Sequence, residues 1–149
     1  MSAMENQTLV RRYFEESWNK HNPAVVDEVY SADFVDSSPE IPGIPPTREG
    51  LKQFMGVYLT AFPDANITIE DQITDGDRVV TRWTGRGTQT GEFMSMPPTG
   101  KTVAVAGIQI DRFSGGKIVE SWVSFDQLGM LQQLGFIPVL QQTAVAARQ

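Results

Sequence analysis

The segment LKQFMGVYLTAFPDANITIED, residues 51–71, contains the change of hydrophobic period that decides the fold. Residues 51–62 repeat apolar side chains at three- and four-residue spacing, which is typical of one buried face of a helix. These apolar residues are Leu51, Phe54, Met55, Tyr58, Leu59 and Phe62. Pro63 ends the helical pattern, and from Ile67 apolar and polar residues alternate, as they do in a half-buried strand. The switch between Pro63 and Ile67 therefore predicts helices before it and strands after it.

Two further helices are predicted before Thr47, which caps the third. Ser2 and Glu5 have the spacing of a capping box, and an apolar stripe follows them. The stripe consists of Leu9, Val10, Tyr13, Phe14 and Trp18. Asn22-Pro23 is a cap followed by proline at the first helical position, and it opens the second helix. The inward residues of that helix are Val25, Val26, Val29 and Tyr30. A proline-rich break over residues 37–46 separates it from the third helix.

Four strands and a short closing helix are predicted after the switch. The strands are expected at residues 67–71, 78–90, 102–113 and 117–125, and the helix at residues 127–134. Helices followed by a meander of strands predict an α+β domain, with an antiparallel sheet and helices on one of its faces. One domain is expected over residues 1–138, followed by an Ala/Gln-rich tail over residues 139–149.

The composition excludes several classes of function. The 149 residues carry 12 Lys and Arg against 18 Asp and Glu, a net charge of −6 that disfavours a nucleic-acid partner. The chain has no cysteine and one histidine, His21, which excludes thiolate catalysis, Cys-ligated zinc and multi-histidine metal sites. It also lacks a run of ~20 apolar residues and the pattern of a signal peptide. We therefore expect a cytoplasmic protein without a membrane or nucleic-acid partner.

Five stretches of the chain resemble one known family. They are residues 18–22 (WNKHN), 33–36 (DFVD), 91–101 (GEFMSMPPTGK), 116–122 (GKIVESW) and 125–135 (FDQLGMLQQLG). Together with the order of the elements, they resemble the SnoaL-like polyketide cyclase (ester cyclase) family of the nuclear-transport-factor-2-like (NTF2-like) fold. The resemblance runs from about Glu5 to Pro138. It implies a cone-shaped fold, in which a curved antiparallel sheet and three N-terminal helices enclose a pocket.

The resemblance also implies an activity. The best-characterised SnoaL-like members close a ring of an aromatic polyketide by intramolecular aldol addition, without a metal or an organic cofactor. Their acid/base is an aspartate near the end of the last strand, and the matching position here is Asp126. One carboxyl group can remove a proton next to a carbonyl and later protonate the new alkoxide, and an apolar cone raises the pKa of such a group toward neutrality. We therefore expect Asp126 inside the cone as the catalytic residue; the alternative is that it only caps the closing helix.

Two other residues are candidates for the catalytic site. Gln109 stands on the third strand, where the aromatic-polyketide cyclases often have a histidine, and its amide can polarise a carbonyl but cannot titrate. Asp36 stands where they have an asparagine. A second carboxylate near the first would push the two pKa values apart. A solvated loop position is the alternative for Asp36, and His21 is expected to be exposed.

Aromatic and methionine side chains are the expected pocket wall. The candidates are Phe14, Trp18, Phe34, Phe54, Tyr58, Trp83, Met94 and Trp122. Only part of the aromatic set is expected to touch a ligand, because aromatic residues at helical spacing are more often core. Met94 and Met96 precede Pro97-Pro98 in the same loop and could form an adaptable lid or a contact between subunits.

Other functions on this fold remain open from the sequence. An epoxide hydrolase of this fold needs an Arg-x-Asp on the second strand, and Arg82-Trp83-Thr84 lacks the aspartate. A ketosteroid-isomerase-like site needs a tyrosine and a protonated acid as hydrogen-bond donors. A non-catalytic binding or oligomerisation module needs neither. We favour a cyclase or isomerase that uses no cofactor and acts on a hydrophobic carbonyl compound.

The outer face of the sheet is expected to be an interface between subunits, because both faces of the third strand carry apolar residues. These are Val103 and Val105 on one face and Ala104, Ala106, Ile108 and Ile110 on the other. Relatives usually cover this face with another subunit. We therefore expect a homodimer or homotetramer, and a monomer in sedimentation at micromolar concentration would contradict this.

Overall fold

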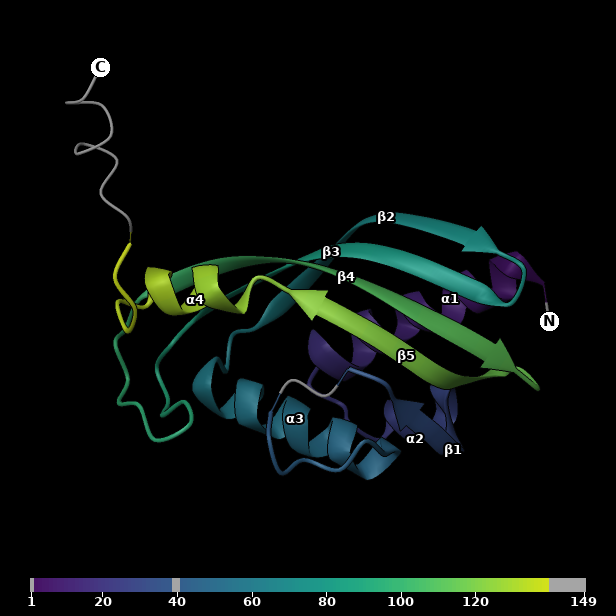
Figure 1. Cartoon of the computed structure of the whole chain (residues 1–149), viewed down its shortest axis with the longest axis horizontal. Helices are drawn as coiled ribbons and strands as arrows, with labels where there is room; N and C mark the ends of the chain where they lie inside the picture. The colour runs from purple at the N-terminus through teal and green to yellow at the C-terminus, as the bar shows by residue number, and fades with distance from the viewer. Residues whose placement is uncertain (1, 39–40, 140–149) are drawn as a thin grey trace, which may run out of the picture.

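The computed structural model describes residues 2–38 and 41–139 and confirms the predicted α+β class (Figure 1). The helical elements are α1 (Ala3–Arg12), its π-helical continuation η1 (Tyr13–Trp18), α2 (Val25–Val29), α3 (Arg48–Ala61) and α4 (Gln127–Gln133). The strands are β1 (Tyr30–Asp36), β2 (Asn66–Asp75), β3 (Arg78–Thr88), β4 (Thr102–Ser114) and β5 (Lys117–Phe125). Apart from Val139, the predicted tail lies outside the described residues.

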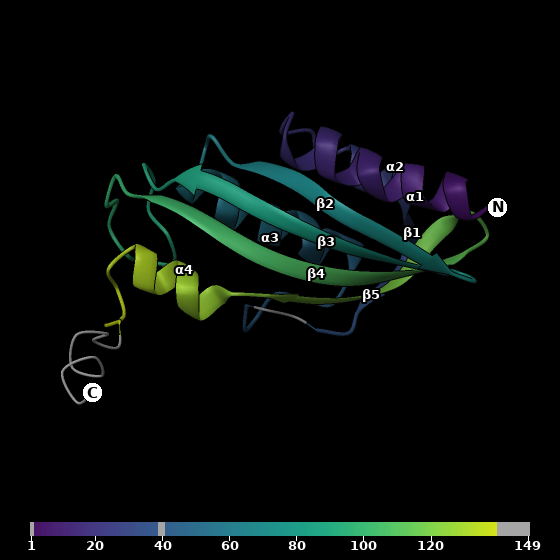
Figure 2. The same cartoon turned by 90° about the horizontal axis from the view of Figure 1, so that it is seen from above.

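The strands form one curved sheet in the order β1-β5-β4-β3-β2. Neighbouring strands are antiparallel, except that β1 and β5 run parallel. Figure 1 shows the sheet curving over α3, with α4 at one end, and Figure 2 shows α1 lying along β2. The helices and the curved sheet thus enclose the space in which the apolar core and the cavity lie.

The first helix begins as its sequence predicts. Ser2 Oγ accepts a hydrogen bond from the Glu5 amide (3.1 Å), and Glu5 Oε1 accepts one from the Ser2 amide (3.3 Å), which confirms the capping box. The helix then widens into the π-helical turn. In that turn the indole Nε1 of Trp18 donates to the hydroxyl of Tyr13, five residues earlier (2.9 Å). The wide turn therefore orients both side chains toward the sheet.

The second helix is shorter than predicted, and the strand that follows it was missed. The placement of Tyr30 in the helix is wrong, because Tyr30 begins β1. Its ring is buried between Tyr13 and Phe34, with ring centroids 5.1 Å and 4.8 Å away. β1 pairs in parallel with β5, more than 80 residues later. Pairing with so distant a strand leaves no local signal in residues 30–36.

The switch from helix to strand falls where the hydrophobic period changes. The helix before the switch, α3, is capped by Thr47 and ends at Ala61. Thr47 Oγ1 accepts a hydrogen bond from the Gly50 amide (3.2 Å). β2 begins at Asn66, so no strand precedes the predicted boundary in this region. A bulge between Ile69 and Asp71 shifts the register of β2 against β3, and the regular alternation predicted over residues 67–71 is interrupted there.

The two faces of β4 differ as the alternation of its residues predicts. Val103 and Val105 are buried toward the helices, whereas the opposite face exposes Ile108 (49%) and, on β2, Ile73 (61%). The homodimer or homotetramer expected through this outer face stays a prediction. No helix within residues 2–38 and 41–139 is long and apolar enough to cross a membrane.

Candidate functional site

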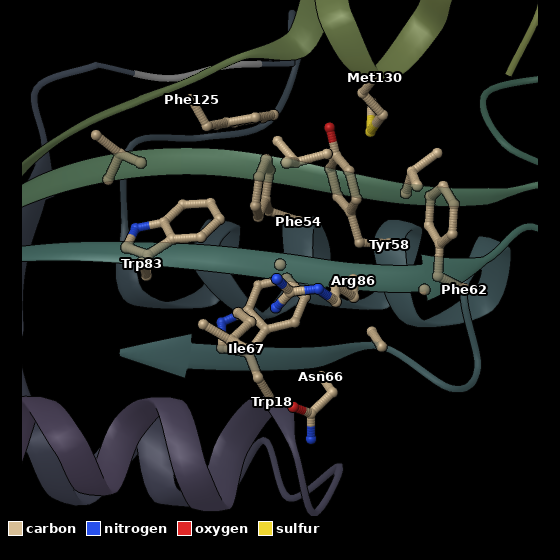
Figure 3. Close-up of a pocket in the computed structure, with 16 residues that line it drawn as sticks. Trp18, Phe54, Tyr58, Phe62, Asn66, Ile67, Trp83, Arg86, Phe125 and Met130 are labelled. Atoms are coloured by element: carbon tan, nitrogen blue, oxygen red, sulfur yellow. The ribbon is translucent and has the colours of Figure 1, made fainter. Parts of the chain in front are cut away.

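An apolar cavity lies between the helices and the inner face of the sheet (Figure 3). Its volume is about 100 Å³, and aromatic rings make up much of its wall. The lining residues are Trp18, Phe54, Tyr58, Phe62, Ala65, Asn66, Ile67, Trp83, Gly85, Arg86, Gly87, Val103, Val105, Val123, Phe125 and Met130. Aliphatic side chains and rings of this kind favour a hydrophobic, partly planar ligand.

Aromatic residues of the cavity wall come from α3 and from strands β3 and β5, and their neighbours in the chain and in the sheet set their positions. Phe54 and Tyr58 lie one turn apart on α3, so their rings contact each other, tilted by 40° with centroids 4.8 Å apart. Trp83 comes from β3, and its indole lies on the backbone of Gly107 in the neighbouring strand. A Cβ at Gly107 would lie 2.2 Å from Trp83 Cζ2, so only glycine leaves room for the ring. Phe125 packs on the same indole, with centroids 6.2 Å apart.

A buried polar cluster lies on the same face of the sheet as the cavity. The carboxyl group of Asp111 is fully buried, and it accepts hydrogen bonds from Gln109 Nε2 (2.9 Å) and from the hydroxyl of Ser121 (2.5 Å). Gln109 and Asp111 are two residues apart on β4, so they share its inner face, and Ser121 is the cross-strand partner of Asp111 on β5. The cluster thus holds one ionisable group between two neutral donors.

The environment of Asp111 tunes its proton affinity. Burial raises the pKa of Asp111 to about 6, because the charged form loses its hydration. The hydrogen bonds from Gln109 and Ser121 oppose this rise, and the negative charge of Asp36 adds to it. A carboxyl group with a pKa near 6 is able both to take and to give a proton near neutral pH.

Two tyrosines border this cluster. Burial raises the pKa of Tyr13 and of Tyr30 above the ordinary value, and the negative charge of Asp111 raises both further. Both hydroxyls therefore stay neutral at physiological pH. The two tyrosine rings also contact each other edge-on, with centroids 5.1 Å apart. A ketosteroid-isomerase-like site pairs a tyrosine with a carboxyl group that stays protonated at neutral pH, whereas Asp111, with a pKa of about 6, is mostly ionised there.

The cavity and the polar cluster are adjacent but separate. Val123 lines the cavity and is the cross-strand partner of Gln109. On the helical side, Trp18 lines the cavity and donates to Tyr13. Neither Gln109 nor Asp111 belongs to the cavity wall; Asp111 lies roughly 7 Å beyond Gln109 along β4. The cluster therefore begins where the cavity ends.

The raised pKa of Asp111 predicts a specific dependence of stability on pH. Because the folded state binds the proton more tightly than the unfolded state, this group's contribution to stability falls as pH rises from 3.8 to about 6. The shift corresponds to about 3 kcal/mol. In Asp111→Asn, the amide of Gln109 can rotate so that its oxygen accepts from the new asparagine. The free energy of unfolding of the variant relative to the parent should therefore rise by about this amount from pH 4 to pH 7. Urea unfolding at the two pH values measures this difference, and equal differences would contradict the assignment.

Asp126 is not inside the cone, so its predicted position is wrong. Its side chain is exposed and caps α4, with Oδ1 accepting from the Gly129 amide (2.9 Å). A Cβ at Gly129 would lie 2.2 Å from Asp126 Oδ2, so the glycine makes room for this cap. The alternative given for Asp126 in the sequence analysis, a cap of the closing helix, therefore describes its geometry.

The structure brings the other two candidate catalytic residues close to Asp111. Gln109 is buried, and its side-chain amide donates a hydrogen bond to the carboxyl group of Asp111. Asp36 is half-buried at the end of β1, where Oδ1 accepts from the Ser38 amide (2.9 Å), and its charge acts on Asp111. The carboxylate pair expected from the sequence therefore consists of Asp36 and Asp111 rather than Asp36 and Asp126.

Four of the eight candidate wall residues line the cavity, and four lie elsewhere. Those in the wall are Trp18, Phe54, Tyr58 and Trp83. Phe14 and Phe34 are buried in the core outside the wall. Met94 is 47% exposed on the loop after β3. Trp122 is the cross-strand partner of Ile110 on the outer face, where the Arg78 guanidinium lies 5.4 Å from its ring centroid. The positions predicted for these last four residues are corrected accordingly.

Asp111, Ser121 and Tyr13 were missed as site residues. One signal for Asp111 is present in the sequence, because it lies an even number of residues from Val103, Val105 and Gln109 and so shares their face. Ser121 is found only through its pairing with Asp111. Within residues 2–38 and 41–139, no three His, Asp or Glu side chains are grouped to hold a metal ion.

Comparison with known proteins identifies similar chains. A sequence model of the SnoaL-like polyketide cyclase family matches residues 8–134. The structure of AclR from Streptomyces galilaeus, provisionally described as a hydroxylase, superposes with a TM-score of 0.84 at 28% identity, covering 99% of this chain and 91% of that one. IdmH from Streptomyces antibioticus, provisionally described as a polyketide cyclase, superposes with a TM-score of 0.77 at 31% identity, covering 87% and 98%. No match was found among functionally curated proteins.

Proposed function

Because this chain belongs to the SnoaL-like polyketide cyclase family and has its NTF2-like fold, we propose that it is a cyclase or isomerase of a hydrophobic carbonyl compound. The observation that carries the proposal is the juxtaposition of an apolar, aromatic cavity with a buried carboxyl group that lies beyond Val123 and Gln109 on the same face of the sheet. The cavity would hold the hydrocarbon part of the substrate, and its carbonyl end would point toward Gln109.

The proposed chemistry is proton transfer by Asp111. For this, the reacting carbon has to lie past Val123, next to Gln109. The Asp111 carboxylate removes a proton from the carbon next to the carbonyl, which leaves an enolate and a protonated acid. In ring closure the enolate carbon attacks a second carbonyl of the same molecule, and Asp111 returns its proton to the new alkoxide. In isomerisation the proton returns to a different carbon. Both routes leave Asp111 in its starting state.

Two buried neutral donors near the cavity, Trp83 and Gln109, bear on the placement of the substrate carbonyl. The indole N–H of Trp83 is buried and has no acceptor among the described residues, and an unpaired buried donor is costly. A substrate carbonyl oxygen that reached this N–H would supply the acceptor. Gln109 bonds to Asp111 through its amide nitrogen, so it would hold the carboxylate in place rather than transfer the proton itself.

A binding module without catalysis is the second candidate. The observation that favours it is that Asp111 does not line the cavity wall. An epoxide hydrolase is less well supported, because Arg82 is exposed on β3 and Thr84 stands in place of the aspartate.

Deuterium exchange on a simple bicyclic ketone tests the proposal without knowledge of the natural substrate. α-Tetralone has two exchangeable protons next to its carbonyl, and proton NMR in D₂O follows their loss. We expect the protein to accelerate this exchange above the rate in buffer alone. Calorimetry on the same samples measures binding. Binding of α-tetralone with exchange at the buffer rate would favour the binding module, and absence of both would contradict the proposed function.

A further inference from the structure

The side chain of Asn19 joins the helical wall of the cavity to the edge of the sheet. It follows η1 directly and is half-buried. Its Nδ2 donates to the Ile67 carbonyl (2.9 Å), and its Oδ1 accepts from the Ile67 amide (2.7 Å). Both backbone groups of one residue in β2 are therefore bonded to a single side chain.

This arrangement replaces a neighbouring strand. β2 is the last strand of the sheet, so its outer backbone groups have no strand partner. Among uncharged side chains, only an amide presents a donor and an acceptor side by side, as a peptide group does. The two bonds therefore extend the sheet by one residue, directly from the end of the π-helical turn.

The hydrogen bonds between Asn19 and Ile67 lie next to the cavity wall. Trp18, the residue before Asn19, lines the cavity, and so does Ile67 (Figure 3). Trp18 is fixed from the other side by its bond to Tyr13. A gap between η1 and β2 would therefore open the cavity to water next to the Trp18 indole.

We propose that Asn19 is a positioning residue that seals the cavity between η1 and β2 and holds Trp18 in its wall. It acts through Trp18 and Ile67 and does not touch the ligand. The part of the inference that concerns ligand affinity rests on the proposed binding of a hydrophobic compound in this cavity; the part that concerns Trp18 does not.

The chain offers a matched control for this residue. Gln133 on α4 makes the same pair of bonds to the backbone of Ala104, with Oε1 accepting from the amide (2.8 Å) and Nε2 donating to the carbonyl (3.0 Å). Gln133 does not line the cavity. Asn19→Ala and Gln133→Ala thus each remove one side-chain amide that makes two hydrogen bonds to the backbone of a strand. Only Asn19 lies next to Trp18 in the cavity wall.

Two readouts separate positioning from stability. The first is the hydrogen-exchange rate of the Trp18 indole N–H, measured by NMR, and the second is the affinity for α-tetralone, measured by calorimetry. In Asn19→Ala we expect faster exchange of the indole proton and an affinity lower by up to about tenfold, because a Trp18 ring that is no longer held in place has to be ordered when the ligand binds. In Gln133→Ala we expect the exchange rate of the Trp18 proton and the affinity to stay at the parent values. The melting temperature should fall in both variants, because each loses two hydrogen bonds.

A second variant keeps the test decisive if Asn19→Ala does not fold. Asn19→Asp keeps the acceptor for the Ile67 amide but places a carboxylate against the Ile67 carbonyl, so it should change both readouts in the same direction. A folded Asn19 variant with parent exchange at Trp18 and parent affinity would overturn the proposal. If the parent protein itself does not bind α-tetralone, the proposed function loses its support, and the exchange of the Trp18 proton alone decides the role of Asn19.

Discussion

Asp111→Asn should lower the rate of α-proton exchange on α-tetralone by a factor of about 10²–10⁴, the contribution typical of one general acid/base. Asparagine has the shape of the protonated acid and can bond to Ser121 and Gln109, but it cannot take a proton. Affinity for α-tetralone should change little, because Asp111 lies outside the cavity wall. Proton NMR in D₂O at saturating ketone, with calorimetry of binding, measures the two effects.

Asp126→Asn is the matched control for this prediction. Asparagine is as good a helix cap as aspartate, so the melting temperature should stay near the parent value. Because Asp126 is exposed at the start of α4, its loss should leave the exchange rate unchanged. If Asp126→Asn lost the exchange activity and Asp111→Asn kept it, the roles assigned to the two aspartates would be reversed.

Val123→Phe should block the inner end of the cavity. Val123 is the wall residue paired with Gln109, so a phenyl ring there would occupy the place proposed for the carbonyl end of the ligand. The affinity for α-tetralone should fall on the order of 10–100-fold, since forcing extra bulk into a packed site costs about 1–3 kcal/mol. The exchange activity should fall with it.

Ser124→Phe is the control for this second prediction. Ser124 is the next residue of β5, is exposed, and pairs with Ile108 on the outer face of the sheet. The added ring is the same, but it lies outside the cavity, and both affinity and exchange should stay at the parent value. Parent affinity in Val123→Phe would show that the ligand does not use this end of the cavity.

Most of the fold could be predicted from local patterns. The capping box at Ser2, the cap at Thr47 and the change of period after Pro63 are interactions between near neighbours, and each has the predicted effect. β1 could not be predicted in this way. It forms because residues 30–36 meet β5, and only the folded chain brings these two segments together.

Alternation along β5 groups residues by side but does not show which side faces the cavity. Alternation in an unbroken strand puts Trp122, Ser124 and Asp126 on one side, and Trp122 and Ser124 do pair with outer-face residues of β4. Which side faces the helices depends on the pairing of β5 with β4, which the local pattern does not contain. The family resemblance places Asp126 in the cone, and alternation then places Trp122 in the cavity wall, whereas both side chains lie outside the cavity.

Asp111 shows the complementary difficulty. An aspartate in a strand ordinarily faces water, because burial of a carboxylate is costly. Here Ser121 and Gln109 supply the hydrogen bonds that make its burial tolerable, and these contacts exist only after the sheet has formed. A buried group of raised pKa that lowers stability at neutral pH is the type of feature that accompanies function.

The crystal structure of the protein with bound α-tetralone tests the central claim most directly, because it locates both the ring and the oxygen of a hydrophobic carbonyl compound. The account predicts that the rings lie among Trp18, Phe54 and Trp83, with the ketone oxygen directed past Val123 toward Gln109. A ligand bound outside the cavity, or one inside it with its oxygen directed away from Gln109, would contradict the account.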